Sequence, residues 1–345
     1  MNRLRLAALT LTVTAFTTVA LIGQGQPKTS AGKMQAAADK FLGSLSPELK
    51  KKAAFDFNDA HRMKWFFTPQ QDKDRKFTRK GARLEEMSAE QKTAAMALLK
   101  TGLSTKGYEQ ATSIVGMEAV LGELEGSKGA MVRNTGWYFV SVFGEPSSTG
   151  KWGWRFEGHH LSVNYTLDKG EVVSATPLLF GVNPADVKAG EKKGLRVTPE
   201  IEDLARALIK SLSAEQDKVA KQPKEFGEIK EGQPKADVGA PVGITADKLT
   251  AEQRATLAKL LQAYTDRMPE DLAATEQKRA KDTPLAKMYF AYAGSPVPGE
   301  AYTYRVYAPD FVVEFLNVQA DSAKNPANHI HSAWRRLPAD FALSE

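Results

Sequence analysis

The fold class is decided by residues 152–165, which read WGWRFEGHHLSVNY. Apolar and polar side chains alternate on both sides of the Gly-His-His centre of this stretch, which is typical of two antiparallel strands joined by a turn. In the second strand His160 falls on the polar face, and the preceding His159 falls on the apolar one. The stretch therefore predicts a β-hairpin whose turn carries two histidines.

A similar stretch recurs near the C-terminus. Residues 302–305 (YTYR) match residues 152–155 (WGWR) at an offset of 150 residues. Upstream, LTAEQ at 249–253 repeats MSAEQ at 87–91, where Ser88 and Gln91 have the spacing of a helix-starting capping box. We therefore predict two internal copies of a helix-plus-meander unit, at about 87–180 and 249–336. The alternative is that capped helices and aromatic strands, both common, coincide by chance.

These patterns predict one α+β domain over residues 34–345, with helices packed on an antiparallel sheet built from the two halves. A third phrase, LSAEQ at 212–216, indicates another helix, and the Pro- and Gly-containing stretch near 221–245 predicts a linker. If the two meanders pair into one sheet or face each other, sites are expected where the halves meet.

The composition is that of an ordinary globular protein, with 345 residues, 42% hydrophobic and 26% charged. This excludes a disordered chain and a polytopic membrane protein. The net charge is +6, but the cations are scattered rather than gathered on one face, so no nucleic-acid partner is predicted.

The N-terminus predicts export. Arg3 and Arg5 precede a mostly apolar, uncharged run to about Ile22, as in a signal peptide over residues 1–30. The run is also long enough to remain as an N-terminal membrane anchor if it is not cleaved. We expect a secreted or periplasmic protein that contacts the membrane only in the uncleaved form.

The histidines point to chemistry. The chain has no cysteine, which excludes disulfides and thiolate sites, and four of its five histidines form two groups, 159–160 and 329–331. In a strand His329 and His331 share a face, so both imidazoles can reach one metal ion. We predict that His160, His329 and His331 hold one divalent transition metal: zinc, iron or copper.

Further site residues follow from the duplication. Glu314 occupies the position that matches Asn164, on the polar face of the second meander, and is predicted as fourth ligand or general base. His159 and Arg155 are predicted to contact the ligands or the substrate, and Arg155 with its counterpart Arg305 could clamp a carboxylate or phosphate. The leading hypothesis is a metal-dependent enzyme, a hydrolase using a metal-activated water or an oxidase, on a small-molecule or polymer substrate.

Two alternatives stay open. The histidines could form a metal-free cluster in a secreted or envelope ligand-binding protein, whose pocket would use arginines and aromatic residues, or they could be a structural hydrogen-bond network. The chain shows no G-x-S-x-G elbow, P-loop or H-E-x-x-H motif, so the common hydrolase readings have no support.

Several phrases resemble one protein family, the domain of unknown function 3500. The resemblance covers the chain from about residue 40 onward and rests on five phrases: FGEP at 143–146, WGWRFEGHHLS at 152–162, GVNP at 181–184, LSAEQ at 212–216 and NHIH at 328–331 with Trp334-Arg335. The resemblance implies an exported bacterial protein and, since the family has no assigned activity, little about function. Its most distinctive phrases contain the two histidine groups.

Overall fold

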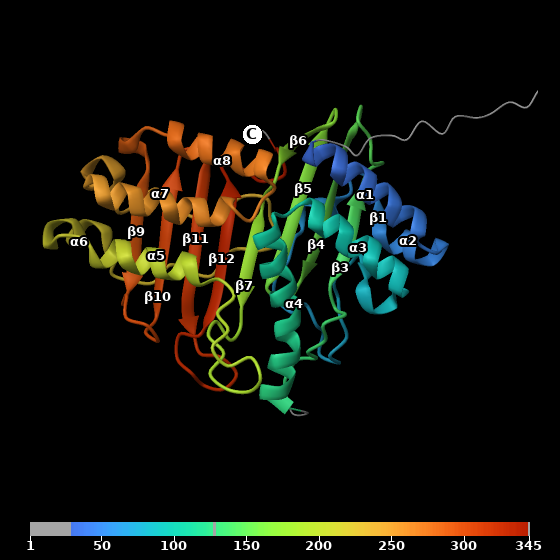
Figure 1. The fold of residues 1–345 in the computed structure, drawn as a ribbon, viewed down its shortest axis with the longest axis horizontal. Helices are drawn as coiled ribbons and strands as arrows, with labels where there is room; N and C mark the ends of the chain where they lie inside the picture. Colours follow the sequence, from blue (N-terminus) through green and yellow to red (C-terminus); the bar gives the residue numbers. More distant parts are fainter. Residues whose placement is uncertain (1–28, 127–128, 344–345) are drawn as a thin grey trace, which may run out of the picture.

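The computed structural model describes residues 29–126 and 129–343, so the predicted export signal lies almost entirely outside the described residues. The described chain forms eight α-helices (Figure 1): α1 (Ser30–Ser44), α2 (Pro47–Ala53), α3 (Ala89–Thr101), α4 (Thr105–Glu125), α5 (Pro199–Lys210), α6 (Ala214–Ala220), α7 (Ala251–Thr265) and α8 (Glu270–Asp282). None of these helices is both long enough and apolar enough to cross a bilayer.

All strands of the described chain belong to one sheet of 12 strands. They are β1 (Ala54–Phe55), β2 (Ala82–Arg83), β3 (Phe139–Phe143), β4 (Lys151–Gly158), β5 (Leu161–Asp168), β6 (Glu171–Ser174), β7 (Leu178–Val182), β8 (Ile244–Thr245), β9 (Tyr289–Gly294), β10 (Tyr302–Ala308), β11 (Phe311–Gln319) and β12 (His329–Arg336). The main order is β1-β3-β4-β5-β7-β12-β11-β10-β9-β8. The α+β class is therefore confirmed.

The sheet is mixed rather than purely antiparallel, which corrects the prediction. The pair β1–β3 is parallel, with Ala54 opposite Val142. The other pairs of named strands are antiparallel, including the predicted hairpin β4–β5, in which Trp154 lies opposite Tyr165. The chain between β1 and β3 includes α3 and α4, and this long connection returns the chain so that β3 runs in the same direction as β1.

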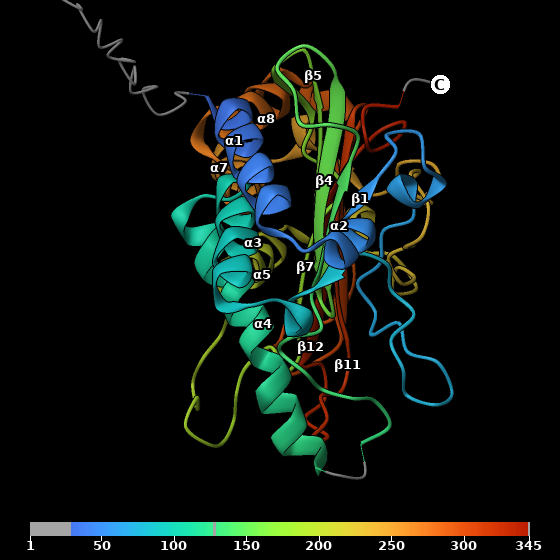
Figure 2. The same cartoon turned by 90° about the vertical axis from the view of Figure 1, so that its right-hand side faces the viewer.

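Most helices cover one face of the sheet, and long loops cover the other (Figure 2). The alternation of β4 explains the division: Trp152, Trp154 and Phe156 belong to the helix-covered core, whereas Arg155 and Glu157 point to the opposite face. Both faces are buried, because the loops also exclude water. A second, smaller apolar cluster lies beneath the loops and includes Trp65, Phe67, Leu179, Ile229 and Leu316.

Buried arginines hold the loops to this polar face. Arg155 is 1% exposed and donates to the backbone carbonyls of Arg62 and Lys64, at 2.5 Å and 2.8 Å. Arg305 and Arg335 make equivalent bonds to the segment between α6 and β8, including 2.7 Å from Arg305 to the Val238 carbonyl. This segment, predicted as a linker, therefore lies across the sheet.

The three repeated phrases all begin helices. Ser88, Ser213 and Thr250 each cap a helix with the side-chain oxygen, and Gln91, Gln216 and Gln253 each return a bond to the cap backbone. These reciprocal bonds satisfy backbone N–H groups that the first helical turn leaves without partners. The prediction of a capping box at Ser88 is confirmed.

The two meanders have matching registers and join at the centre of the sheet. Trp154 pairs with Tyr165 in the first, and Tyr304 pairs with Phe315 in the second, each partner displaced by the same 150 residues. The meanders meet where β7 pairs antiparallel with β12. The ends of these two central strands, together with the β4–β5 turn, position the histidines.

Candidate metal centre

The sheet brings the two histidine groups together. His159 and His160 form the turn between β4 and β5. His329 and His331 are the first and third residues of β12. β7 bridges them, because it pairs with β5 through Phe180 and with β12 through Gly181, which lies opposite His331. Groups 170 residues apart in the chain thus meet at one end of three neighbouring strands.

The backbone of His160 is fixed on both sides. Its φ angle is 63°, a left-handed conformation that is uncommon for residues other than glycine. Its N–H donates to the Phe67 carbonyl at 2.8 Å, and its carbonyl accepts from the Gly181 N–H at 2.7 Å. Such a conformation persists when its surroundings impose it, and here it turns the imidazole toward β12.

The imidazoles of His160, His329 and His331 converge. One ring nitrogen from each lies within 4.8 Å of the others. The Nε2 atoms of His160 and His329 are 2.7 Å apart, which is a hydrogen bond between one protonated and one unprotonated nitrogen. Two nitrogens bound to one tetrahedral zinc would be about 3.3 Å apart, so metal binding would require these two nitrogens to move apart by about 0.6 Å and to lose the shared proton.

Glu228 determines which nitrogen of His331 is free. The Nδ1 atom of His331 lies 2.9 Å from Glu228 Oε1. An ionised carboxylate can only accept, so Nδ1 carries the proton and Nε2 keeps its lone pair. Partial burial acts to raise the pKa of Glu228, but the hydrogen bond and charge of His331, the Ile229 backbone N–H and the Lys230 cation together lower it. Metal-binding histidines commonly have such a carboxylate behind the ligand ring.

His159 supports the cluster from the helix-covered side. Its ring stacks on that of His160, with centroids 3.7 Å apart, and its Nδ1 donates to the Glu118 carboxylate. Arg133 Nη1 lies 3.2 Å from the same nitrogen and is bound to Glu125 through its other nitrogens. His159 therefore contacts the His160 ring and Glu118 of α4, and it is not one of the three converging histidines.

The pKa values of His160 and His329 are lowered by burial. Burial lowers the pKa of His160 well below its ordinary value, and the neighbouring histidines add to the effect. Burial, followed by His331, lowers the pKa of His329 to about 2. A metal ion needs the unprotonated imidazole, so these shifts keep the ligands in the form that binds.

The donor set fits a transition metal. It consists of three imidazoles with a carboxylate behind one of them, and contains no sulfur. Nitrogen ligands suit zinc, iron or copper and are unsuited to calcium or magnesium. His160 and His331 are 3% and 6% exposed, whereas His329 is half-buried and gives the cluster its contact with solvent.

Glu314 and Arg155, the other two predicted site residues, are not among these residues. Glu314 lies opposite Ala333, two residue pairs along β11–β12 from His331, and its carboxylate binds Arg305 at 3.2 Å. Arg155 binds Asn164 at 2.7 Å and loop carbonyls. Glu314 and Arg155 lie within strands on the polar face of the sheet. The histidines instead gather at the end of the strands, at the β4–β5 turn and the start of β12.

The aromatic residues and arginines predicted to line a ligand pocket are buried inside the protein. Trp152 and Trp154 are buried in the core beneath the helices. Arg155 and Arg305 do occupy matched positions, and both bind backbone carbonyls of the covering loops. These arginines therefore attach loops to the sheet.

Three residues of the centre were missed by sequence analysis. Glu118 lies on the buried face of α4 with Ile114, Met117 and Leu121, and a carboxylate among apolar positions is a signal that periodicity could have given. Gly181 belongs to a recognised phrase, and a Cβ there would lie 3.1 Å from the Cδ2 atoms of both His160 and His331. Glu228 lies in an irregular segment without a comparable signal.

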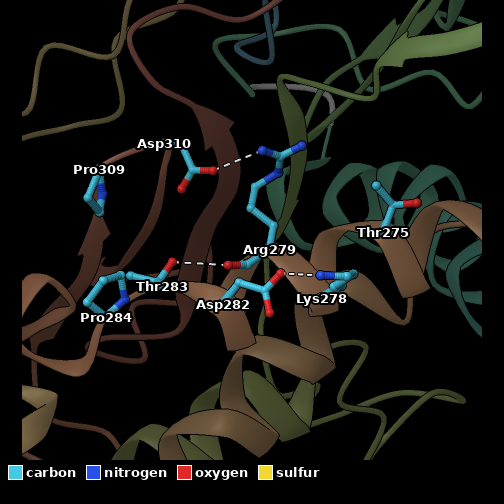
Figure 3. Close-up of a pocket in the computed structure, with 8 residues that line it drawn as sticks. All are labelled: Thr275, Lys278, Arg279, Asp282, Thr283, Pro284, Pro309 and Asp310. Atoms are coloured by element: carbon cyan, nitrogen blue, oxygen red, sulfur yellow. Dashed lines mark hydrogen bonds and ion pairs between the residues drawn. The ribbon is translucent and has the colours of Figure 1, made fainter.

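A separate surface cavity lies at the turn between β10 and β11, the turn of the second meander that corresponds to the His159-His160 turn of the first (Figure 3). It has a volume of about 490 Å³, and its side chains form ion pairs, with Arg279 bound to Asp310 at 2.9 Å. The Asp310 carbonyl binds Leu337, at the far end of β12 from His329. No histidine lines this cavity.

Comparison with known proteins gives a family and no activity. Residues 27–343 match the family described as protein of unknown function DUF3500. Comparisons with curated proteins and with solved structures found no match. The match includes the hairpin with His159 and His160 and the strand with His329 and His331, and it covers almost the whole sequence. The chain belongs to the DUF3500 family.

Proposed function

We propose that this protein is a metal-dependent enzyme in which His160, His329 and His331 bind one zinc, iron or copper ion. The observation that carries the proposal is the convergence of three ring nitrogens within 4.8 Å. The lowered pKa of His160 and His329 and the Glu228 carboxylate behind His331 support it, because both favour metal-binding imidazoles.

The ligand number favours catalysis over a structural role. Among the described residues the group consists of three side chains, and structural zinc sites are usually closed by a fourth. A metal held by these three side chains would have a coordination position left for water or substrate, and half-buried His329 is the most exposed of the three residues. With zinc, a metal-activated water would make the protein a hydrolase; with iron or copper, the same ligands would support oxidation.

The test is the metal content of protein produced without a His tag. We expect near-stoichiometric zinc, iron or copper by mass spectrometry in the wild type and its loss in a His329→Ala/His331→Ala variant. His61→Ala is the matched control, because His61 contacts Phe55 and Phe143 away from the cluster. The proposal fails if the wild type stays metal-free after incubation with each of the three metals.

The metal found decides the next assay. Zinc would direct it to ester, amide and phosphoester hydrolysis, and iron or copper to oxygen consumption with candidate substrates. Loss of activity in the double variant, with activity retained in His61→Ala, would link the reaction to the cluster. A stoichiometric metal that no chelator removes, with no exchangeable water on it, would instead indicate a structural site.

We also propose that the two halves are copies of one unit. The equal registers of β4–β5 and β10–β11 support this, as do the capping boxes that begin α3 and α7. The halves are alike in a further way. In the first, Ala54 follows the short capped helix α2 and pairs in parallel with β3; in the second, Lys221 follows the short capped helix α6 and pairs in parallel with β9. Superposition of the halves in a crystal structure tests the proposal, which requires all these elements to overlay together.

Export of the protein is a further proposal, based on the charge and apolar pattern of residues 1–30. Expression of the full chain in a bacterial host followed by fractionation and N-terminal sequencing tests it. We expect a mature N-terminus between the apolar run and α1 in the periplasmic or secreted fraction. Full-length chain in the cytoplasm alone would contradict it.

A further inference from the structure

A largely apolar cavity of about 480 Å³ lies between α7 and α8. The two helices lie side by side (Figure 1), and the short connection 266–269 makes them run in opposite directions. The walls are formed mainly by apolar side chains of both helices and of the segment that follows α8: Leu257, Ala258, Leu261, Ala280, Leu285 and Met288. The volume is that of a small-molecule pocket, about 300–1,000 Å³. The cavity can therefore hold a small molecule with an apolar body.

The cavity leaves apolar surface in contact with water. Leu285 is 46% exposed, and Ala255 and Ala258 are exposed on the wall formed by α7. Alanines at these positions leave space that longer side chains would fill. An apolar ligand in this space would remove the exposed surface from water, which is favourable in proportion to the area covered.

The cavity is elongated along the helix pair. Its lining extends from Arg254, near the start of α7, to Thr265, at its end, an advance of about 16 Å at 1.5 Å per residue. At one end Gln277 of α8 donates to the Thr265 hydroxyl at 3.2 Å. At the other end the backbone N–H of Ala246 donates to the Met288 carbonyl at 2.8 Å. The space between these two bonds suits a linear chain.

Two cationic side chains line one end of the cavity. Arg254 lies near the start of α7 and Lys281 in the last turn of α8, so the opposite directions of the two helices bring both cations to the same end. Arg254 is held in place by a hydrogen bond from Nη1 to the Leu249 carbonyl. The other donors of its guanidinium and the exposed Lys281 ammonium are available to a ligand.

Among the described residues, no acidic side chain lines the cavity. The carboxylates nearest to the two cations in sequence have other partners: Asp282 pairs with Lys278, and Glu252 accepts from the Thr250 hydroxyl at 3.0 Å. Neither cation forms an ion pair within the described part of the chain. This end of the cavity therefore carries positive charge that suits an anionic group.

We propose that this cavity binds a fatty-acid-like molecule, with its linear chain between α7 and α8 and its carboxylate at Arg254 and Lys281. The chain would cover the apolar walls, and the carboxylate would meet two cations that have no carboxylate partner in the described chain. Apolar walls alone would accept any apolar chain, and the cations alone would attract any anion, so the combination selects the ligand class. Binding does not involve the histidine cluster, so this proposal is independent of the proposed function.

The test is calorimetric titration of the full chain with dodecanoate, kept below the concentration at which it forms micelles. We expect a Kd below about 100 μM. Decanoate should bind at least about fivefold more weakly, because its shorter chain covers less apolar surface. Dodecyltrimethylammonium, which has the same chain and the opposite charge, should also bind at least about fivefold more weakly than dodecanoate.

Variants separate the two parts of the site. Arg254→Gln/Lys281→Gln should weaken dodecanoate binding by about tenfold and remove the preference over dodecyltrimethylammonium. Ala258→Trp should fill the cavity and prevent binding of both molecules, and, because Ala258 is exposed, it should unfold near the wild-type temperature. Lys259→Gln removes an exposed cation of α7 that does not line the cavity, so this matched control should bind dodecanoate like the wild type.

The proposal is overturned if dodecanoate does not bind the wild type or if dodecyltrimethylammonium binds as tightly. It is also overturned if folded Ala258→Trp, or the double Gln variant, binds dodecanoate as the wild type does. Sedimentation of the wild type as a dimer that Ala258→Trp converts into a monomer would overturn it too, because a second copy of the chain would then occupy the cavity.

Discussion

His331 donates from Nδ1 to the Glu228 carboxylate across 2.9 Å, which links a central strand to the long segment between α6 and β8. The bond fixes the ring orientation and leaves Nε2 to face His160 and His329. A residue far from β12 in sequence thus decides which nitrogen of His331 is available to a metal.

Replacing Glu228 by Gln should weaken metal binding. An amide holds the ring less firmly and makes the nitrogen less basic, so we expect the dissociation constant to rise by about 10- to 100-fold. A competition titration against a chromogenic chelator measures the change. Glu225→Gln, on an exposed residue of the same segment, should leave affinity unchanged. Equal affinities for all three proteins would show that Glu228 has no part in the site.

Replacing Gly181 by Ala should disturb two ligand rings without removing either. The new Cβ would lie 2.8 Å from the Ile330 carbonyl oxygen and 3.1 Å from a carbon of both His160 and His331. Overpacking of this kind costs about 1–3 kcal/mol of stability, and we expect weaker metal binding as well. Thermal unfolding and metal titration measure both. Gly227→Ala, which has open space around it, is the control.

Replacing Arg155 by Met should destabilise the fold and spare the metal centre. The change removes the hydrogen bonds to loop carbonyls and to Asn164 and leaves Glu157 with one fewer cation. Removing one partner of a buried pair costs about 3–5 kcal/mol, which urea unfolding can measure. We expect the folded fraction to hold as much metal as the wild type. A stable variant without metal would restore Arg155 to the site.

His61 should make the protein sensitive to acid. Burial, with the Arg155 cation as the next cause, lowers its pKa from 6.5 to about 3. Below pH 6.5 the unfolded chain takes up a proton that the folded chain does not, so stability falls as the pH is lowered from 6.5 toward 3.

His61→Phe should remove this contribution, because Phe55 and Phe143 already surround the ring. Between about pH 7.5 and pH 5.5 the variant should lose about 1.4 kcal/mol less stability than the wild type. Urea unfolding at the two pH values gives the difference. Parallel losses in both proteins would mean that His61 is not protonated differently in the two states.

Local sequence patterns were sufficient for the elements that carry the histidines. Alternation around Gly158 predicted the β4–β5 hairpin, and the spacing of Ser88 and Gln91 predicted the start of α3. Both predictions depend only on residues close together in the chain, because strand alternation and capping-box hydrogen bonds involve residues a few positions apart. The mutual proximity of His160, His329 and His331 was also predicted, because the halves were expected to meet.

The placement of Glu314 depended on information that alternation does not contain. Its face of the sheet was predicted, but its distance from the histidines depends on the register of β11 with β12, where it lies opposite Ala333. The Glu314 carboxylate is also bound by Arg305 of β10. Glu228, in contrast, lies in a segment without periodicity, so its approach to His331 follows only from the path of that segment across the sheet.

The sequence by itself determined the α+β class, the hairpin turn with two histidines and the absence of sulfur ligands, because these follow from residue types and short-range periodicity. Only the tertiary structure decided that β7 lies between β5 and β12, that Glu118 and Glu228 support the imidazoles, and that Glu314 and Arg155 lie elsewhere. Strand order and loop paths join residues more than 100 positions apart, and such contacts are selected by the packing of the whole core rather than by any local pattern.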